Sequence, residues 1–124
     1  MSTTFYGRAA DGEPIMLDHE DPAHLNLSCC NARAFLSFVG LDAGLGPSGE
    51  VGLPLARRAI MRARATFDRR VGSYTRQMSD TRRPGRCRVV VAGVDEAYFE
   101  RRLADFERFL GEVVERGAIS IYWA

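Results

Sequence analysis

The chain of 124 residues contains no lysine, only two histidines and no long run of apolar residues. A helix that crosses a membrane needs roughly 20 consecutive apolar residues, and no segment comes near that length. The first residues also lack the basic start and the apolar stretch of a signal peptide, so we expect a cytoplasmic protein. The glycine-rich stretch at 44–52 lacks both the lysine and the preceding strand that a phosphate-binding loop requires.

Cysteine is scarce too, and the three that exist are placed badly for disulfides. Cys29 and Cys30 are adjacent, which does not fit ordinary disulfide geometry, and with Cys87 the count is odd. We therefore expect all three to be reduced. A thiol at a helix start can act as a nucleophile, but the histidines that could assist one, His19 and His24, lie in an upstream loop. We favour one cysteine of the adjacent pair facing the core and the other lying near the surface.

The remaining candidates for chemistry have simpler explanations. Structural zinc sites usually hold their ligands in pairs about two to four residues apart, and the histidines and cysteines of this chain do not have that spacing. The acidic stretch at 18–21 could include a general acid and a general base, yet such a cluster is usually a solvated loop. The sequence thus predicts no metal site, no cofactor and no catalytic residue, and an enzyme is the less favoured interpretation.

Charge is distributed very unevenly along the chain, although the formal net charge is only +1. Residues 53–88 carry 11 arginines against two aspartates, a local excess of nine positive charges. Residues 1–52 carry two arginines against seven acidic residues, and residues 89–124 carry four against seven. Such segregation would steer a charged partner toward one side of the protein.

Hydrophobic periodicity predicts a single α+β domain over residues 1–124, with a small mixed β-sheet and three helices packed on it. Two β-prone runs on either side of Asp11 and Gly12 predict a hairpin, because this pair tolerates a tight turn. The last two predicted strands are separated by a long helix and form a C-terminal strand–helix–strand unit, in which parallel neighbours are the default. The predicted strands are the two hairpin runs within 4–18 and residues 24–28, 87–94 and 118–124.

Three segments have apolar residues at the spacing of amphipathic helices. Ser28 is the expected N-cap of the first, with Asn31 as the competing choice, and Gly40 provides a left-handed stop. Asp95 is the expected cap of the last. The predicted helices are 29–39, 53–71 and 96–116, and the glycine-rich stretch at 41–52 is predicted to be a loop.

Residues 25–41, LNLSCCNARAFLSFVGL, resemble a segment of short uncharacterised bacterial proteins. In that pattern Leu-Asn-Leu-Ser is followed by Asn-Ala-Arg-Ala and by an apolar helix that ends in Gly-Leu. The resemblance covers about a seventh of the chain and implies a bacterial origin, without implying an activity. Cys29 and Cys30 are not part of the pattern, which argues against a shared catalytic thiol. The matching positions here are Leu25, Asn26, Leu27, Ser28, Asn31, Ala32, Arg33, Ala34, Gly40 and Leu41.

The arginines of the middle segment are the candidate binding residues, because a forked guanidinium binds carboxylates and phosphates through paired hydrogen bonds. On the second predicted helix they lie opposite an apolar stripe. Since the chain has no lysine, some of them must serve ordinary solvated surfaces, and the acidic flanks could neutralise part of their charge within the fold or across a homodimer. The candidates are Arg58, Arg62, Arg69, Arg70, Arg76, Arg82, Arg83 and Arg86.

Small size, segregated charge and the absence of a catalytic constellation favour a non-enzymatic recognition protein that binds another protein. An immunity or antitoxin-like inhibitor and a phage accessory factor are examples of this class. The alternative is a nucleic-acid-binding protein that contacts phosphates through its arginines, although Tyr74 is the one aromatic residue among them for base stacking. A thiol enzyme that uses Cys29 or Cys30 is a third and less favoured interpretation. We expect no membrane partner.

Overall fold

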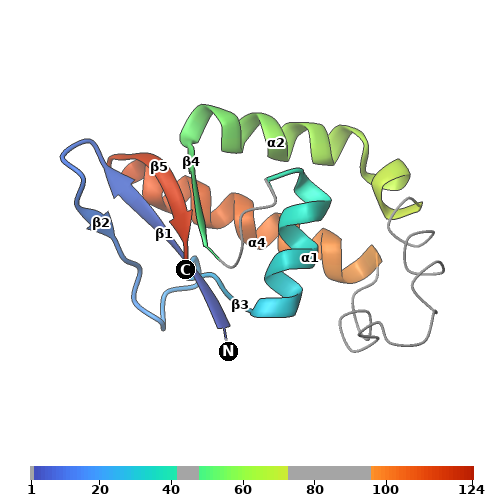
Figure 1. The fold of residues 1–124 in the computed structure, drawn as a ribbon, viewed down its shortest axis with the longest axis horizontal. Helices are drawn as coiled ribbons and strands as arrows, with labels where there is room; N and C mark the ends of the chain where they lie inside the picture. The colour runs from blue at the N-terminus through green and yellow to red at the C-terminus, as the bar shows by residue number, and fades with distance from the viewer. Residues whose placement is uncertain (1, 42–47, 73–95) are drawn as a thin grey trace.

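A computed structural model of the chain describes residues 2–41, 48–72 and 96–124 (Figure 1). It has the predicted α+β fold, in which the long last helix is followed by a C-terminal strand. In chain order the elements are β1 (Ser2–Ala9), β2 (Pro14–Ile15), β3 (Asn26–Ser28), α1 (Cys29–Val39), β4 (Gly49–Gly52), α2 (Leu53–Ala65), α4 (Glu96–Glu115) and β5 (Ala118–Trp123). A further helical segment at 67–72 follows α2.

The strands form one five-stranded sheet in the order β2-β1-β5-β4, with β3 paired to the start of β1. Every described pairing is antiparallel. The predicted strand at 87–94, from which we expected a parallel neighbour, lies outside the described residues.

The predictions for the first third of the chain are confirmed. β1 and β2 form the hairpin, and Gly12 in its turn has a φ of +88°, which glycine adopts without strain. Residues 26–28 form the short third strand. Ser28 caps α1, since its hydroxyl accepts a hydrogen bond from the backbone N–H of Asn31 at 3.3 Å. Gly40, with a φ of +79°, ends the helix as expected.

The region predicted to be a loop contains a strand, β4, which pairs with β5. Gly49 lies opposite Trp123 in this pairing, and a Cβ atom at position 49 would be only 2.6 Å from the indole ring. The glycine is therefore needed for the close approach of the tryptophan. The same glycine-rich composition that makes the contact possible conceals the strand in the sequence, because glycine is rare in strand interiors.

The second helix is shorter than predicted, because α2 ends at Ala65 and helical structure resumes only at 67–72. Thr66 stands at the break, where its backbone N–H and its hydroxyl both donate to the carbonyl of Arg62. A threonine hydroxyl bonded back to a helix carbonyl in this way tends to bend or end a helix. Phe67 and Val71 nevertheless pack against the core as the continuous stripe predicted.

The helices and the inner face of the sheet enclose one hydrophobic cluster. Phe5 of β1 packs edge-on against Phe106 of α4, with ring centroids 5.7 Å apart, and Figure 1 shows α4 crossing behind the strands. Phe38 of α1 stacks on Phe99 at a centroid distance of 4.1 Å. None of the described helices is both long enough and apolar enough to span a membrane.

Candidate interaction surface

The two sides of α2 have opposite character. Ala56, Ile60 and Ala63 are buried, at 0%, 6% and 0% exposure, because they recur at helical spacing on the side that faces the core. The helix contacts β4, β5 and α1 through this side. Its other side faces solvent along the upper edge of the molecule in Figure 1.

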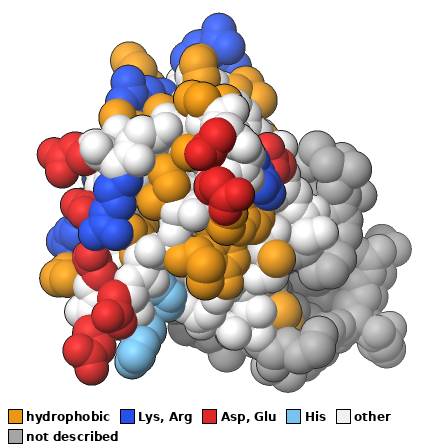
Figure 2. All heavy atoms as spheres, turned by 90° about the vertical axis from the view of Figure 1, so that its left-hand side faces the viewer, with side chains coloured by type: hydrophobic (Ala, Val, Ile, Leu, Met, Phe, Trp, Pro, Cys, Tyr) orange, Lys and Arg blue, Asp and Glu red, His pale blue; other side chains and the backbone are white. Residues whose placement is uncertain are grey.

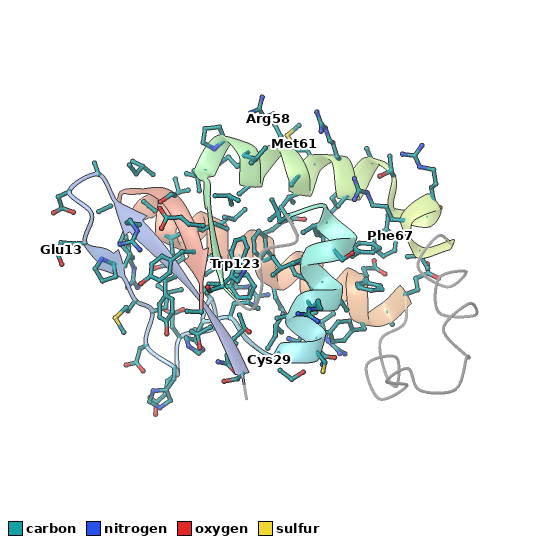
Figure 3. All side chains as sticks on the ribbon, in the orientation of Figure 1. Glu13, Cys29, Arg58, Met61, Phe67 and Trp123 are labelled. Carbon is teal, nitrogen blue, oxygen red and sulfur yellow. The ribbon has the colours of Figure 1, made fainter. Side chains whose placement is uncertain are left out.

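The outward side of α2 combines arginines with exposed apolar residues. Arg58 is at its centre, because its neighbours on a helix surface three and four positions away include Leu55, Met61 and Arg62. Leu55 is 49% exposed and Met61 is 69% exposed. Figure 3 shows Arg58 and Met61 pointing away from the body of the protein. We call this surface the α2 arginine face, made up of Leu55, Arg57, Arg58, Met61 and Arg62.

The positive charge of the α2 arginine face is not neutralised by the described part of the protein. α2 contains no acidic residue, and none of the described carboxylates forms an ion pair with Arg57, Arg58 or Arg62. Like charges four residues apart on a helix, such as Arg58 and Arg62, destabilise it by about 0.2–0.5 kcal/mol. The spacing of Arg58 and Arg62 therefore does not itself stabilise the helix.

The other arginines predicted to bind a partner have different positions. Arg69, in the segment after α2, is exposed and has no ion pair with a described residue. Arg70 turns inward, because it donates to the carbonyl of Phe38 at 2.7 Å and to the hydroxyl of Thr66 at 2.7 Å. It holds the end of α1 against the segment at 67–72, which is a structural role. Arg76, Arg82, Arg83 and Arg86 lie outside the described residues.

Two residues of this surface, Leu55 and Met61, were not among the predicted binding residues. A signal for them exists in the sequence, because both fall outside the apolar stripe of Ala56, Ile60 and Ala63. Single exposed apolar residues are common, but two that lie close together on the polar side of an amphipathic helix can belong to an interaction surface. Arg57 is also exposed beside them and was not predicted, because nothing in the sequence distinguishes it from its neighbour Arg58.

The adjacent thiols are unpaired, as expected, and differ in exposure. Neither Cys29 nor Cys30 belongs to the hydrophobic core, so the expectation that one of them faces the core is not confirmed. Cys29 is half-buried and accepts a hydrogen bond from the Thr3 hydroxyl at 3.8 Å, while Cys30 is exposed. Of the two histidines, His19 contacts the carboxylate of its neighbour Asp18 at 3.2 Å. Cys87 lies outside the described residues.

The acidic stretch after β2 forms a solvated loop. Asp18 and Glu20 are exposed, and Asp21 forms an ion pair with Arg116 at 3.4 Å that ties the loop to the end of α4. Within residues 2–41, 48–72 and 96–124, no group of three or more histidine, cysteine and carboxylate side chains could hold a metal ion.

Comparison of the chain with protein families, with curated proteins and with solved structures finds no match. The likeness of residues 25–41 to short bacterial proteins stays a prediction.

Proposed function

We propose that this protein is a non-enzymatic recognition protein that binds another protein through the α2 arginine face. The observation that carries the proposal is the exposure of Met61 and Leu55, at 69% and 49%, among three arginines that form no ion pair with a described residue. An inhibitor of the immunity or antitoxin kind, or a phage accessory factor, would use a surface of this type.

The composition of the face supports a protein partner. Arginine, methionine and aromatic residues are enriched at the centres of protein interfaces, where apolar side chains fill pockets and arginines bind carboxylates. Covering Leu55 and Met61 would remove apolar area from water, a gain of about 25 cal/mol per Å². The surrounding guanidinium groups select a partner surface that is acidic around an apolar centre.

Nucleic acid is the second candidate, because Arg57, Arg58, Arg62 and Arg69 are exposed and form no ion pair within the described residues. Phosphate binding needs cationic side chains alone, so it gives no reason for a methionine to be exposed between them. Base stacking needs an aromatic side chain, and the sequence of α2 contains none. These two observations favour protein over nucleic acid.

Site-specific photo-cross-linking in the native host tests the proposal. A photo-reactive residue is placed at position 61 on α2 and, as the matched control, at Ala104, which is exposed on α4. We expect one protein to cross-link from position 61 and none from position 104, with the same yield after nuclease treatment. A product that disappears with nuclease would replace the proposal with nucleic-acid binding.

The cross-linked partner must then bind the purified protein. Changing Arg58→Glu and Arg62→Glu together should abolish that binding without changing the circular dichroism spectrum, because both side chains are exposed. If the double variant binds as well as the wild type, the α2 arginine face is not the recognition surface.

A further inference from the structure

One face of the sheet packs on the core, and the opposite face carries a pair of stacked tyrosines. Side chains alternate along a strand, so Phe5 and Trp123 point into the core while Tyr6 and Tyr122 point to the opposite side. Tyr6 and Tyr122 are cross-strand partners, and their rings stack at a centroid distance of 5.0 Å. They lie on β1 and β5, the two central strands.

Arg8 is fixed on this face by three contacts. Its Nε donates to Glu50 Oε1 at 3.0 Å and its Nη1 donates to the carbonyl of Gly12 at 2.9 Å. The guanidinium carbon also lies 4.4 Å from the centre of the Tyr122 ring. Glu50 in turn accepts a hydrogen bond from the hydroxyl of Ser120 at 3.2 Å. We use the name tyrosine face for the set Tyr6, Arg8, Glu50, Ser120 and Tyr122.

Exposed apolar residues border the tyrosine face. Met16, 63% exposed, is the first residue past β2 and follows Ile15, which packs against the core; we infer that it lies on the outer side of the sheet, since the alternation of β2 continued by one residue places it there. Ile119, 55% exposed, lies in a bulge of β5 between Ala118 and Ser120. Figure 2 shows hydrophobic side chains gathered in the middle of the side of the molecule that carries the β1–β2 hairpin.

The charges on the described surface indicate which molecule could bind to the tyrosine face. Its two charged groups, Arg8 and Glu50, neutralise each other, so two copies of the face can meet without repulsion between like charges. The α2 arginine face has one sign of charge and would repel its own copy. Long-range repulsion between two chains is also weak, because the net charge is only +1.

We propose that the tyrosine face, with Met16 and Ile119 at its border, is the interface of a two-fold symmetric homodimer. In such a dimer each copy presents the same patch to the other. Tyrosine, arginine and methionine are the residue types enriched at the centres of interfaces. The α2 arginine faces would stay free and be displayed twice, so a partner with two acidic sites would bind more tightly than one with a single site. The inference does not depend on the proposed function.

Sedimentation velocity over a wide range of protein concentration tests this interface. We compare the wild type with Met16→Glu and, as the matched control, with Met61→Glu, since both methionines are more than half exposed and neither change disturbs the core. The wild type and Met61→Glu should form dimers with the same dissociation constant. Met16→Glu should raise that constant by more than about tenfold, because it replaces an apolar contact at the border of the interface with an unpaired carboxylate that would have to lose water.

A second variant tests the charge argument separately. Glu50→Gln leaves Arg8 without its counter-charge, so dimerisation should weaken and the loss should be largest at low salt, where repulsion between the two copies of Arg8 is least screened. A wild type that stays monomeric at every concentration would overturn the proposal. So would a dimer that Met61→Glu disrupts and Met16→Glu does not, because copies would then associate through α2.

Discussion

α2 and α4 both place an apolar side on the same core, but their outer sides are organised differently. On α4, Arg102 forms an ion pair with Asp105 at 3.0 Å, and Arg116, just past its end, pairs with Glu112 at 2.9 Å. The outer side of α2 has arginines and no acidic residue. Both helices have the amphipathic pattern that a two-layer fold requires, so the fold does not account for the difference.

The comparison distinguishes charged residues that stabilise their own helix from charged residues that do not. Oppositely charged pairs one turn apart stabilise a helix, and like charges at the same spacing destabilise it. α4 has the first arrangement and α2 the second, together with the exposed Leu55 and Met61. The charges on the outer side of α4 therefore contribute to the stability of the helix, whereas those on the outer side of α2 do not, which is consistent with the proposal that α2 binds a partner.

The largest expected effects concern what the two helices share, their inner sides. Phe106→Ala on α4 should lower the free energy of unfolding by about 3–5 kcal/mol, and Ile60→Ala on α2 by about 2–5 kcal/mol, because both side chains are buried and leave cavities. Urea unfolding followed by circular dichroism measures both. A loss below about 1 kcal/mol for either variant would mean that its helix is not packed on the core as described.

The next largest effect concerns the apolar residues of the α2 arginine face. Met61→Ala should weaken binding of the cross-linked partner by about tenfold, which corresponds to about 1.4 kcal/mol, while the free energy of unfolding changes by less than about 0.5 kcal/mol. Ala104→Ser on the outer side of α4 is the control and should change neither. Unchanged affinity of Met61→Ala, measured by titration calorimetry, would leave the exposed methionine without an explanation.

A smaller effect is expected where the two helices are joined. Arg64 is an arginine of α2 that does find an acidic partner, Glu107 of α4, and both side chains are more than two-fifths exposed. Exposed ion pairs contribute about 0.2–1 kcal/mol. A double-mutant cycle with Arg64→Ala and Glu107→Ala should give a coupling energy in that range, measured from urea unfolding at low salt. A coupling energy of zero would place Arg64 with the unpaired arginines.

The smallest expected effect is the change in stability when an arginine is replaced by glutamate, and its sign should differ between α2 and α4. Arg58→Glu should stabilise the protein by about 0.4–1 kcal/mol, because the new carboxylate attracts Arg62 four residues later, whereas the arginine repels it. Arg102→Glu should destabilise the protein, because the new carboxylate faces Asp105. Thermal unfolding of both variants measures the two signs. A loss of stability on Arg58→Glu would show that Arg58 has a structural partner after all.

The elements with clear local signals were predicted correctly. α1 has Ser28 and Gly40 at its ends, and the buried side of α4 follows from residues such as Phe99, Leu103 and Phe106. Caps and periodicity are properties of neighbouring residues, so the sequence contains them. The α+β class follows from their order along the chain.

The features that depend on distant contacts were missed. β4 pairs with β5, where Gly49 lies against Trp123, and this partner is far away in the sequence and gives no local sign. Arg70 was predicted to bind a partner, but the carbonyl of Phe38 is close enough in the fold to accept its hydrogen bond. The candidate site was predicted in part, since its arginines stand out by charge and its apolar residues are identified only once the inner side of α2 is known.

Binding of the cross-linked partner to three forms of the protein tests the central claim most directly. Isothermal titration calorimetry would compare the wild type, Arg58→Glu with Arg62→Glu on α2, and Arg101→Glu with Arg108→Glu on the exposed side of α4. Each double variant makes the same change in net charge. The account predicts that affinity is lost on α2 and changes less than about threefold on α4. Equal losses on the two helices would contradict it, because net charge rather than a particular surface would then govern binding.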